Sequence, residues 1–143
     1  MPQRPNPFRE YASRVPTGDA CPFCPGREGM TPPEVLAYRP DGDAANAPRW
    51  SVRVVPNRFP ALRIEGTLEK RPEGLYDKMR GVGAHEVIIE TPEHDSDPSR
   101  YAPARMTDLI HAYRDRVTDL LRDGRFRFVL VFKNHGAPSG ATI

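Results

Sequence analysis

Two cysteines lie three residues apart, in Cys21-Pro-Phe-Cys24, and they are the residues best able to do chemistry. Three interpretations are open: a redox pair, two buried thiols, or half of a tetrahedral zinc site. A redox pair places its first cysteine at a helix N-terminus, whereas Pro25 and Gly26 directly after Cys24 oppose a helix. We favour the zinc interpretation. Because the chain has only 2 cysteines, the remaining ligands must be histidines.

Four histidines are available as further ligands. His94 lies in Thr91-Pro-Glu-His-Asp95, a turn that a proline makes rigid, and it is the predicted third ligand. His85 opens a predicted strand, His111 falls on the polar side of a predicted helix, and His135 follows the last predicted strand. No pattern in the sequence identifies a fourth ligand.

Composition restricts the class of protein. At 143 residues the chain fits one domain, and a net charge of +2 is too small to indicate a nucleic-acid or membrane partner. No apolar run of about 18 residues is present, and the N-terminus has no signal-peptide pattern, so we expect a cytoplasmic protein. The 17 prolines are concentrated before residue 61 and predict a loop-rich first half that begins with an extended arm, residues 1–20.

The elements that must position the cysteines and histidines can be read from hydrophobic spacing. In the second predicted strand Val52 and Val54 point to one side, and Arg53 and Val55 to the other. We interpret residues 63–83 as a long loop because they have weak periodicity. The predicted strands are Glu34–Tyr38, Ser51–Val55, His85–Glu90 and Phe126–Phe132.

One long amphipathic helix is predicted before the last strand, with Gly124 as its C-terminal stop. Strands that flank a single helix, with an antiparallel order, give an α+β domain. The apolar residues predicted to form the buried face of the helix are Met106, Leu109, Ile110, Tyr113, Val117, Leu120 and Leu121.

Four blocks of sequence, in this order, resemble the N-terminal half of the galactose-1-phosphate uridylyltransferases, a branch of the histidine-triad superfamily. They span most of the chain from Cys21 to its end, and each alone would be weak. The blocks are Cys21-Pro-Phe-Cys-Pro-Gly-Arg-Glu28 with Thr31-Pro-Pro-Glu34, Val55-Pro-Asn-Arg-Phe-Pro-Ala-Leu62, Gly83–Asp95, and Val131-Phe-Lys-Asn-His-Gly-Ala-Pro-Ser-Gly-Ala-Thr-Ile143.

This resemblance implies a histidine-triad-like antiparallel sheet that is incomplete at both ends, so that residues 21–143 form a partial N-terminal nucleotidyltransferase domain. It implies zinc held by Cys21, Cys24 and His94. It also implies transfer of a nucleotidyl group, in galactose metabolism, between UDP-glucose and a hexose 1-phosphate through a covalent histidine intermediate. The nucleophile is the second histidine of a His-Pro-His motif that follows Gly-Ala-Thr, and it would lie beyond Ile143. We therefore assign no catalytic residue to this chain and expect it to be an inactive fragment.

Substrate-binding residues are implied in the same way. Arg4 matches an arginine that reaches the sugar phosphate in a neighbouring subunit of a homodimer. Asn57 and Arg58 match the lining of the nucleotide pocket, although some relatives carry an acidic residue in place of Arg58. The loop that contains Asn134, Gly136, Gly140 and Thr142 could offer backbone N–H groups and a hydroxyl to a phosphate. For the segment with Asn57 and Arg58, and for the loop with Asn134 and Thr142, the alternative interpretation is an ordinary turn.

The sequence also allows two other functions. One is a related enzyme that acts on ADP-glucose or a dinucleoside polyphosphate, because base selectivity cannot be read from these residues. The other is a non-catalytic zinc-binding module.

Overall fold

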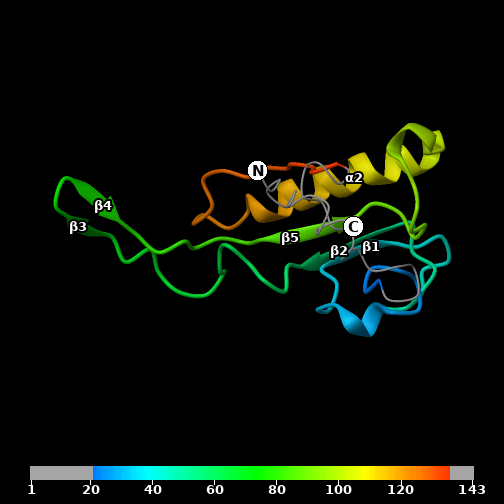
Figure 1. The fold of residues 1–143 in the computed structure, drawn as a ribbon, viewed down its shortest axis with the longest axis horizontal. Coiled ribbons are helices and arrows are strands. Elements are labelled where there is room, and N and C mark those ends of the chain that lie inside the picture. Colours follow the sequence, from blue (N-terminus) through cyan, green and yellow to red (C-terminus); the bar gives the residue numbers. More distant parts are fainter. Residues whose placement is uncertain (1–20, 136–143) are drawn as a thin grey trace, which may run out of the picture.

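The computed structural model describes residues 21–135 of the chain and contains a three-stranded antiparallel sheet (Figure 1). Its strands are β1 (Leu36–Tyr38), β2 (Val52–Pro56) and β5 (Glu86–Ile89), in the order β1-β2-β5. With the long helix α2 (Pro103–Leu120), this sheet confirms the predicted α+β class. The predicted N-terminal arm, residues 1–20, lies outside the described residues.

β2 separates two small hydrophobic clusters, as its alternation predicts. Val52 packs with Leu109 and Ala112 of α2 on one face of the sheet. Val55, on the other face, packs with Trp50 and Ile89. Both valines are at most 1% exposed, so the central strand is buried on both faces. In Figure 1 α2 covers one face of the sheet, and the segment that carries the cysteines covers the other.

Helix α2 begins at Pro103, where a proline costs no hydrogen bond, and ends at Leu120. The predicted buried face is partly wrong. Ile110 and Leu121 are 52% and 51% exposed, whereas Ala112, which was not predicted to be buried, is fully buried. The sheet is only three strands wide, so it covers a narrow stripe centred on Leu109 and Ala112. The helix also stops before Gly124, with Leu121 in a right-handed conformation at its C-cap.

The prediction of a long loop for residues 63–83 is wrong, because this segment contains a two-stranded hairpin. β3 (Arg71–Glu73) pairs with β4 (Tyr76–Lys78) across Gly74 and Leu75. Gly74 has φ of +64°, and glycine with positive φ at the first central position is typical of tight hairpin turns. Every residue of both strands is exposed, so no buried face produced an alternating pattern in the sequence.

Phe126–Phe132 is not a strand, contrary to the prediction. Among the described residues, no backbone–backbone hydrogen bond joins residues 127–135 to any other segment. Within residues 21–135, β5 pairs with β2 on one side only, and residues 125–135 lie across a cleft from it. The aromatic and aliphatic alternation therefore remains without a strand partner, and Phe128 is 77% exposed.

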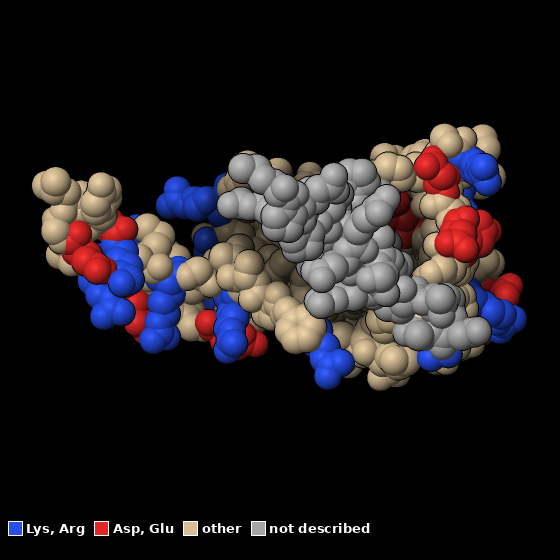
Figure 2. Space-filling model, viewed as in Figure 1, with Lys and Arg blue, Asp and Glu red and all other residues tan. Residues whose placement is uncertain are grey.

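Two short 3₁₀ helices complete the described elements, η2 (Glu28–Met30) and η3 (Pro98–Arg100). None of the helices in the described part of the chain is both long and apolar enough to span a membrane. Figure 2 shows positive and negative side chains intermixed on the projecting β3–β4 end, where Lys78 pairs with Glu73 and Arg80 with Glu69.

Candidate metal and nucleotide site

The cysteine knuckle, residues 21–26, is a tight double turn with a sulfur at its centre. The Phe23 N–H points to Cys21 Sγ at 3.4 Å, and the Cys24 N–H donates to the Cys21 carbonyl at 3.4 Å. The Arg27 N–H donates to the Cys24 carbonyl at 3.2 Å. Gly26, with φ of +84°, makes the sharp exit that L-residues rarely adopt. The Cys-Pro-Phe-Cys-Pro-Gly sequence thus folds without a helix, which opposes the redox interpretation.

His94 lies against this knuckle although it is 70 residues away in sequence. Its Nδ1 is 3.3 Å from Cys24 Sγ. One ligand atom from each of Cys21, Cys24 and His94 falls within 4.8 Å of the others. Two thiols and one imidazole at this separation suit a tetrahedral zinc ion, for which they supply three of four ligands. Among the described residues no fourth histidine, cysteine or carboxylate joins the group.

The electrostatics of the knuckle also suit a cation. Burial raises the pKa of the Cys24 thiol, and the hydrogen bond and charge of Cys21 raise it further. Without a cation, burial and the neighbouring Cys21 therefore disfavour the thiolate form of Cys24. A bound metal reverses this balance because thiolates, and not thiols, are the ligands.

A cleft of about 1210 Å³ runs along the edge of β5 that faces away from β2 and reaches the knuckle. Its lining includes every residue from Ala84 to His94, so the start of β5 and the proposed metal ligands lie in one continuous groove. The opposite wall is formed by α2 side chains, among them Tyr113 and Arg116, and by residues 125–135. This volume exceeds that of common small-molecule pockets and is large enough for a nucleotide sugar.

Asn57 lines the cleft, and His85 fixes its position. The Asn57 N–H donates to the His85 carbonyl at 2.8 Å, and the Asn57 amide nitrogen lies 3.3 Å from His85 Nε2. His85 Nδ1 accepts the Ala61 N–H at 3.0 Å. The imidazole therefore holds both ends of the loop 57–61. From the sequence, His85 is predicted only to open a strand, and the separation of Asn57 and His85 along the chain gives no signal of this contact.

Glu90 gathers donors from three segments at the middle of the cleft. It accepts hydrogen bonds from Tyr113 at 2.9 Å and Tyr101 at 3.4 Å, and it pairs with Lys133. Burial, followed by the charge of Glu90, raises the pKa of Tyr101 to about 12. Both tyrosines thus remain donors at neutral pH. The Lys133 pair ties the segment after α2 to the end of β5.

The other predicted substrate-binding residues are placed as follows. Asn134 is exposed and lines the cleft. Arg58 is exposed and is not among the described residues that line the cleft. Arg4, Gly140 and Thr142 lie outside the described residues.

Comparison with known proteins gives the same family from sequence and from structure. Residues 75–143 match the family model described as the DUF4931 N-terminal domain, a domain of unknown function. ADP-glucose phosphorylase of Arabidopsis thaliana is 36% identical over 145 residues, covering 99% of this chain and 40% of that protein. Galactose-1-phosphate uridylyltransferase of Streptomyces lividans is 26% identical over 128 residues, covering 90% of this chain and 28% of that protein.

A solved structure agrees with these matches. The crystal structure of an ADP-glucose phosphorylase from Arabidopsis thaliana with bound ADP-glucose aligns with a TM-score of 0.69 and 33% identity, covering 95% of this chain and 40% of that chain. The chain thus spans less than half the length of these relatives. The sequence blocks that resemble the uridylyltransferases therefore lie on a fold that such proteins share, and the chain belongs to the galactose-1-phosphate uridylyltransferase family.

Proposed function

We propose that the protein represented by this chain transfers a nucleotidyl group from a nucleotide sugar, with ADP-glucose as the preferred donor, to a phosphate acceptor. The observation that carries this proposal is 36% identity to an ADP-glucose phosphorylase across 99% of the chain. The cleft supports it, because Asn57 and Asn134 both line a groove of sufficient volume. UDP-glucose, the donor expected from the sequence, becomes the second candidate because uridylyltransferases also match.

The proposed reaction breaks the bond from the α-phosphorus of the donor to the oxygen that bridges it to the β-phosphorus. Hexose 1-phosphate leaves with that bridging oxygen, and a histidine nitrogen takes the nucleotidyl group. An oxygen of the acceptor, either inorganic phosphate or a second hexose 1-phosphate, then displaces the histidine. The resemblance puts this histidine after Thr142, outside the 143 residues, so the chain itself contributes binding residues and no nucleophile.

We propose that zinc is the metal bound by Cys21, Cys24 and His94. The distances among these ligand atoms and the N–H group directed at Cys21 Sγ support this proposal. When bound, the metal supplies a cross-link between the knuckle and the turn after β5. The knuckle and the turn after β5 then keep the part of the cleft that they line in a fixed shape.

The remaining proposals concern the substrate and the assembly. Asn57, Arg58 and Asn134 contact the nucleotide, and Gly140 and Thr142 contact its phosphates. Arg4 reaches the hexose phosphate bound by the second subunit of a homodimer. The protein is cytoplasmic and serves carbohydrate metabolism. Arg58, which is exposed, needs to turn toward the cleft to make its contact.

The test is calorimetric titration of the 143-residue chain with ADP-glucose, UDP-glucose and glucose 1-phosphate. We expect ADP-glucose to bind most tightly and Asn57→Ala to weaken it about tenfold, as the loss of one or two hydrogen bonds would. Thr118→Ala, exposed on α2, is the control and should leave binding unchanged. Preference for UDP-glucose would assign the uridylyltransferase reaction instead. Failure of both nucleotide sugars to bind would refute the proposal.

A further inference from the structure

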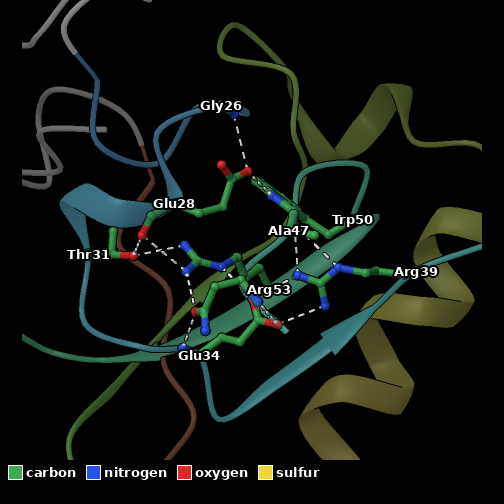
Figure 3. Close-up of polar contacts among 9 residues, drawn as sticks. Gly26, Glu28, Thr31, Glu34, Arg39, Ala47, Trp50 and Arg53 are labelled. Atoms are coloured by element: carbon green, nitrogen blue, oxygen red, sulfur yellow. Dashed lines mark hydrogen bonds and ion pairs between the residues drawn. The ribbon is translucent and has the colours of Figure 1, made fainter. Parts of the chain in front are cut away.

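A buried polar network lies behind the cysteine knuckle, on the face of the sheet away from α2 (Figure 3). At its centre is Arg53 of β2, which is only 1% exposed. Its guanidinium donates to Glu34 at 2.7 Å and to Thr31 at 2.8 Å. It also donates to the carbonyl of Glu28 at 3.4 Å and to Asn46 at 3.2 Å. One strand residue therefore binds four residues of the segment that follows the cysteines.

Glu34 links Arg53 to a second guanidinium, that of Arg39. Its two oxygens pair with Arg39 at 2.7 and 2.9 Å, and one of them also accepts the Asn46 N–H at 2.8 Å. The side chains of Glu34, Arg39 and Arg53 are at most 6% exposed. With Glu28 the network holds two carboxylates and two guanidiniums, so its formal charges cancel. Among the described residues, no buried side-chain nitrogen or oxygen lacks a hydrogen-bond partner.

Glu28 connects this network to the knuckle. Its Oε1 accepts the Gly26 N–H at 3.2 Å and the indole N–H of Trp50 at 2.9 Å. Gly26 is the last residue of the knuckle, two positions after Cys24. Trp50 also belongs to the cluster against which Phe23 packs. The knuckle is thus held by a buried carboxylate at Gly26 and by the packing of Phe23 against a buried cluster.

We propose that Glu28 is a positioning residue that, supported by Arg53 and Trp50, holds the Cys21–Cys24 half of the site in its binding conformation before any metal arrives. The inference rests on the metal site of the proposed function. Small zinc modules generally gain their fold from the metal. Here the contacts of the knuckle to Glu28 and to the cluster that contains Trp50 involve no ligand atom, so metal binding need not supply their energy.

The hydrogen bonds to the buried carboxylate of Glu28 support this role. Burial by itself would raise the pKa of Glu28, but hydrogen bonds from Trp50, from its own N–H and from Gly26 outweigh it and lower that pKa. The bonds from Gly26 and from Trp50 are both accepted by the same oxygen, Oε1. Glutamine at position 28 presents an equivalent carbonyl oxygen and can accept both N–H groups, whereas alanine can accept neither.

The first measurement is amide hydrogen exchange of the metal-free wild-type chain. We expect the Phe23 and Gly26 amides to be protected at least tenfold relative to an unstructured peptide. Exchange of both amides at the unstructured rate would overturn the proposal, because the knuckle would then form only with metal. This measurement needs no variant and no nucleotide, so it stands even if nucleotide binding fails.

The second measurement is the affinity for Co²⁺ and Zn²⁺ alone, determined by competition with a chromophoric chelator. Because the metal would then have to order the knuckle without the Gly26–Glu28 hydrogen bond, we expect about a tenfold loss of affinity for Glu28→Ala and recovery to within about threefold for Glu28→Gln. Glu73→Ala, in the exposed hairpin, is the matched control. Wild-type affinity in Glu28→Ala would contradict the proposal. If Glu28→Ala does not fold, a tenfold loss in folded Glu28→Gln would also contradict it.

Discussion

Individual side chains in this protein fix loops by pairing residues that are distant in sequence. His94 meets Cys24 across 70 positions, and Arg116 binds both oxygens of Glu86 across 30. These contacts are specific because each one satisfies a polar atom that packing removes from water. The site therefore depends on a few named atoms more than on the total area of the core.

The proposed metal site gives the first prediction at this scale. Cys21→Ser should lower zinc content from about one ion per chain to well below half, because a serine hydroxyl is a poor zinc ligand at neutral pH. Acidification should release the metal as the thiols and the imidazole bind protons. Elemental analysis of purified wild-type and variant protein measures both effects. Equal zinc in the two proteins would remove Cys21 from the ligand set.

His85 gives a second prediction, because its ring binds the loop 57–61. His85→Ala removes the acceptor of the Ala61 N–H, so exchange of that amide should accelerate at least tenfold. Affinity for ADP-glucose should also fall, since Asn57 loses the group that its amide faces. His111→Ala, exposed on α2, is the control and should change neither quantity. An unchanged Ala61 exchange rate would show that the imidazole does not hold the loop.

Glu34 predicts how stability depends on acidity. Burial would raise its pKa, but hydrogen bonds from Arg39, Asn46 and Arg53 lower it from 4.5 to about 2. A depressed pKa stabilises the fold above pH 4.5, and this contribution is lost as pH falls toward 2. The loss should be on the order of 2–3 kcal/mol. Urea unfolding between pH 5 and 2.5 measures it. Glu34→Gln should show a shallower dependence, and an equal slope in both proteins would contradict the assignment.

At the scale of secondary structure, the stability of α2 on the sheet depends on a narrow contact. Leu109 is 4% exposed and packs against Val52, whereas its neighbour Ile110 is 52% exposed. Leu109→Ala should therefore cost about 2–5 kcal/mol, and Ile110→Ala less than about 1 kcal/mol. Chemical denaturation of the two variants compares them directly. Equal losses would mean that the buried stripe of the helix is broader than described.

Some of the helices and strands could be predicted from the sequence, and others could not. β1, β2, β5 and α2 could be predicted because each carries apolar residues at the spacing of its own period and lies between prolines or glycines. The β3–β4 hairpin could not, because neither face is buried and Gly74 was its only signal. Phe126–Phe132 has the alternation of a strand, but a strand also needs a hydrogen-bonded neighbour, which no local pattern encodes.

The candidate site was predicted to a similar extent. The cysteine pair and His94 could be found because their spacing and the proline turn limit the possible chemistry. The positions of His85, Glu28 and Arg53 depend on long-range contacts that one sequence does not reveal. Arg53 was read only as one side of an alternating strand, although it proves to be the centre of a buried network.

For the molecule as a whole, the 143-residue chain is predicted to form no covalent nucleotidyl adduct. His135 lies in the proposed phosphate loop, but it precedes Gly140 and Thr142, whereas the expected nucleophile follows them, and its Nε2 lies 3.5 Å from Asp97. A nucleophile must be held within about 3–3.5 Å of the reacting atom, and a displaced imidazole loses most of that advantage.

Incubation with ADP-glucose or UDP-glucose labelled at the α-phosphate tests this prediction. We expect no acid-labile label on the protein. Label that is present in wild-type protein and absent from His135→Ala would identify His135 as a nucleophile and contradict us. Label retained in both proteins would point to a different residue.

The buried network of Glu28, Glu34, Arg39 and Arg53 also constrains how this sequence can change over evolutionary time. Replacing Arg53 alone leaves Glu34 with one guanidinium in place of two and Thr31 without its donor, and replacing Glu34 alone removes the carboxylate that both guanidiniums bind. Since removing one partner of a buried ion pair costs about 3–5 kcal/mol, most single substitutions pass through an unstable intermediate. Homologues should therefore keep positions 34 and 53 together or exchange both together. In an alignment, this covariation would mark the network without any knowledge of the structure.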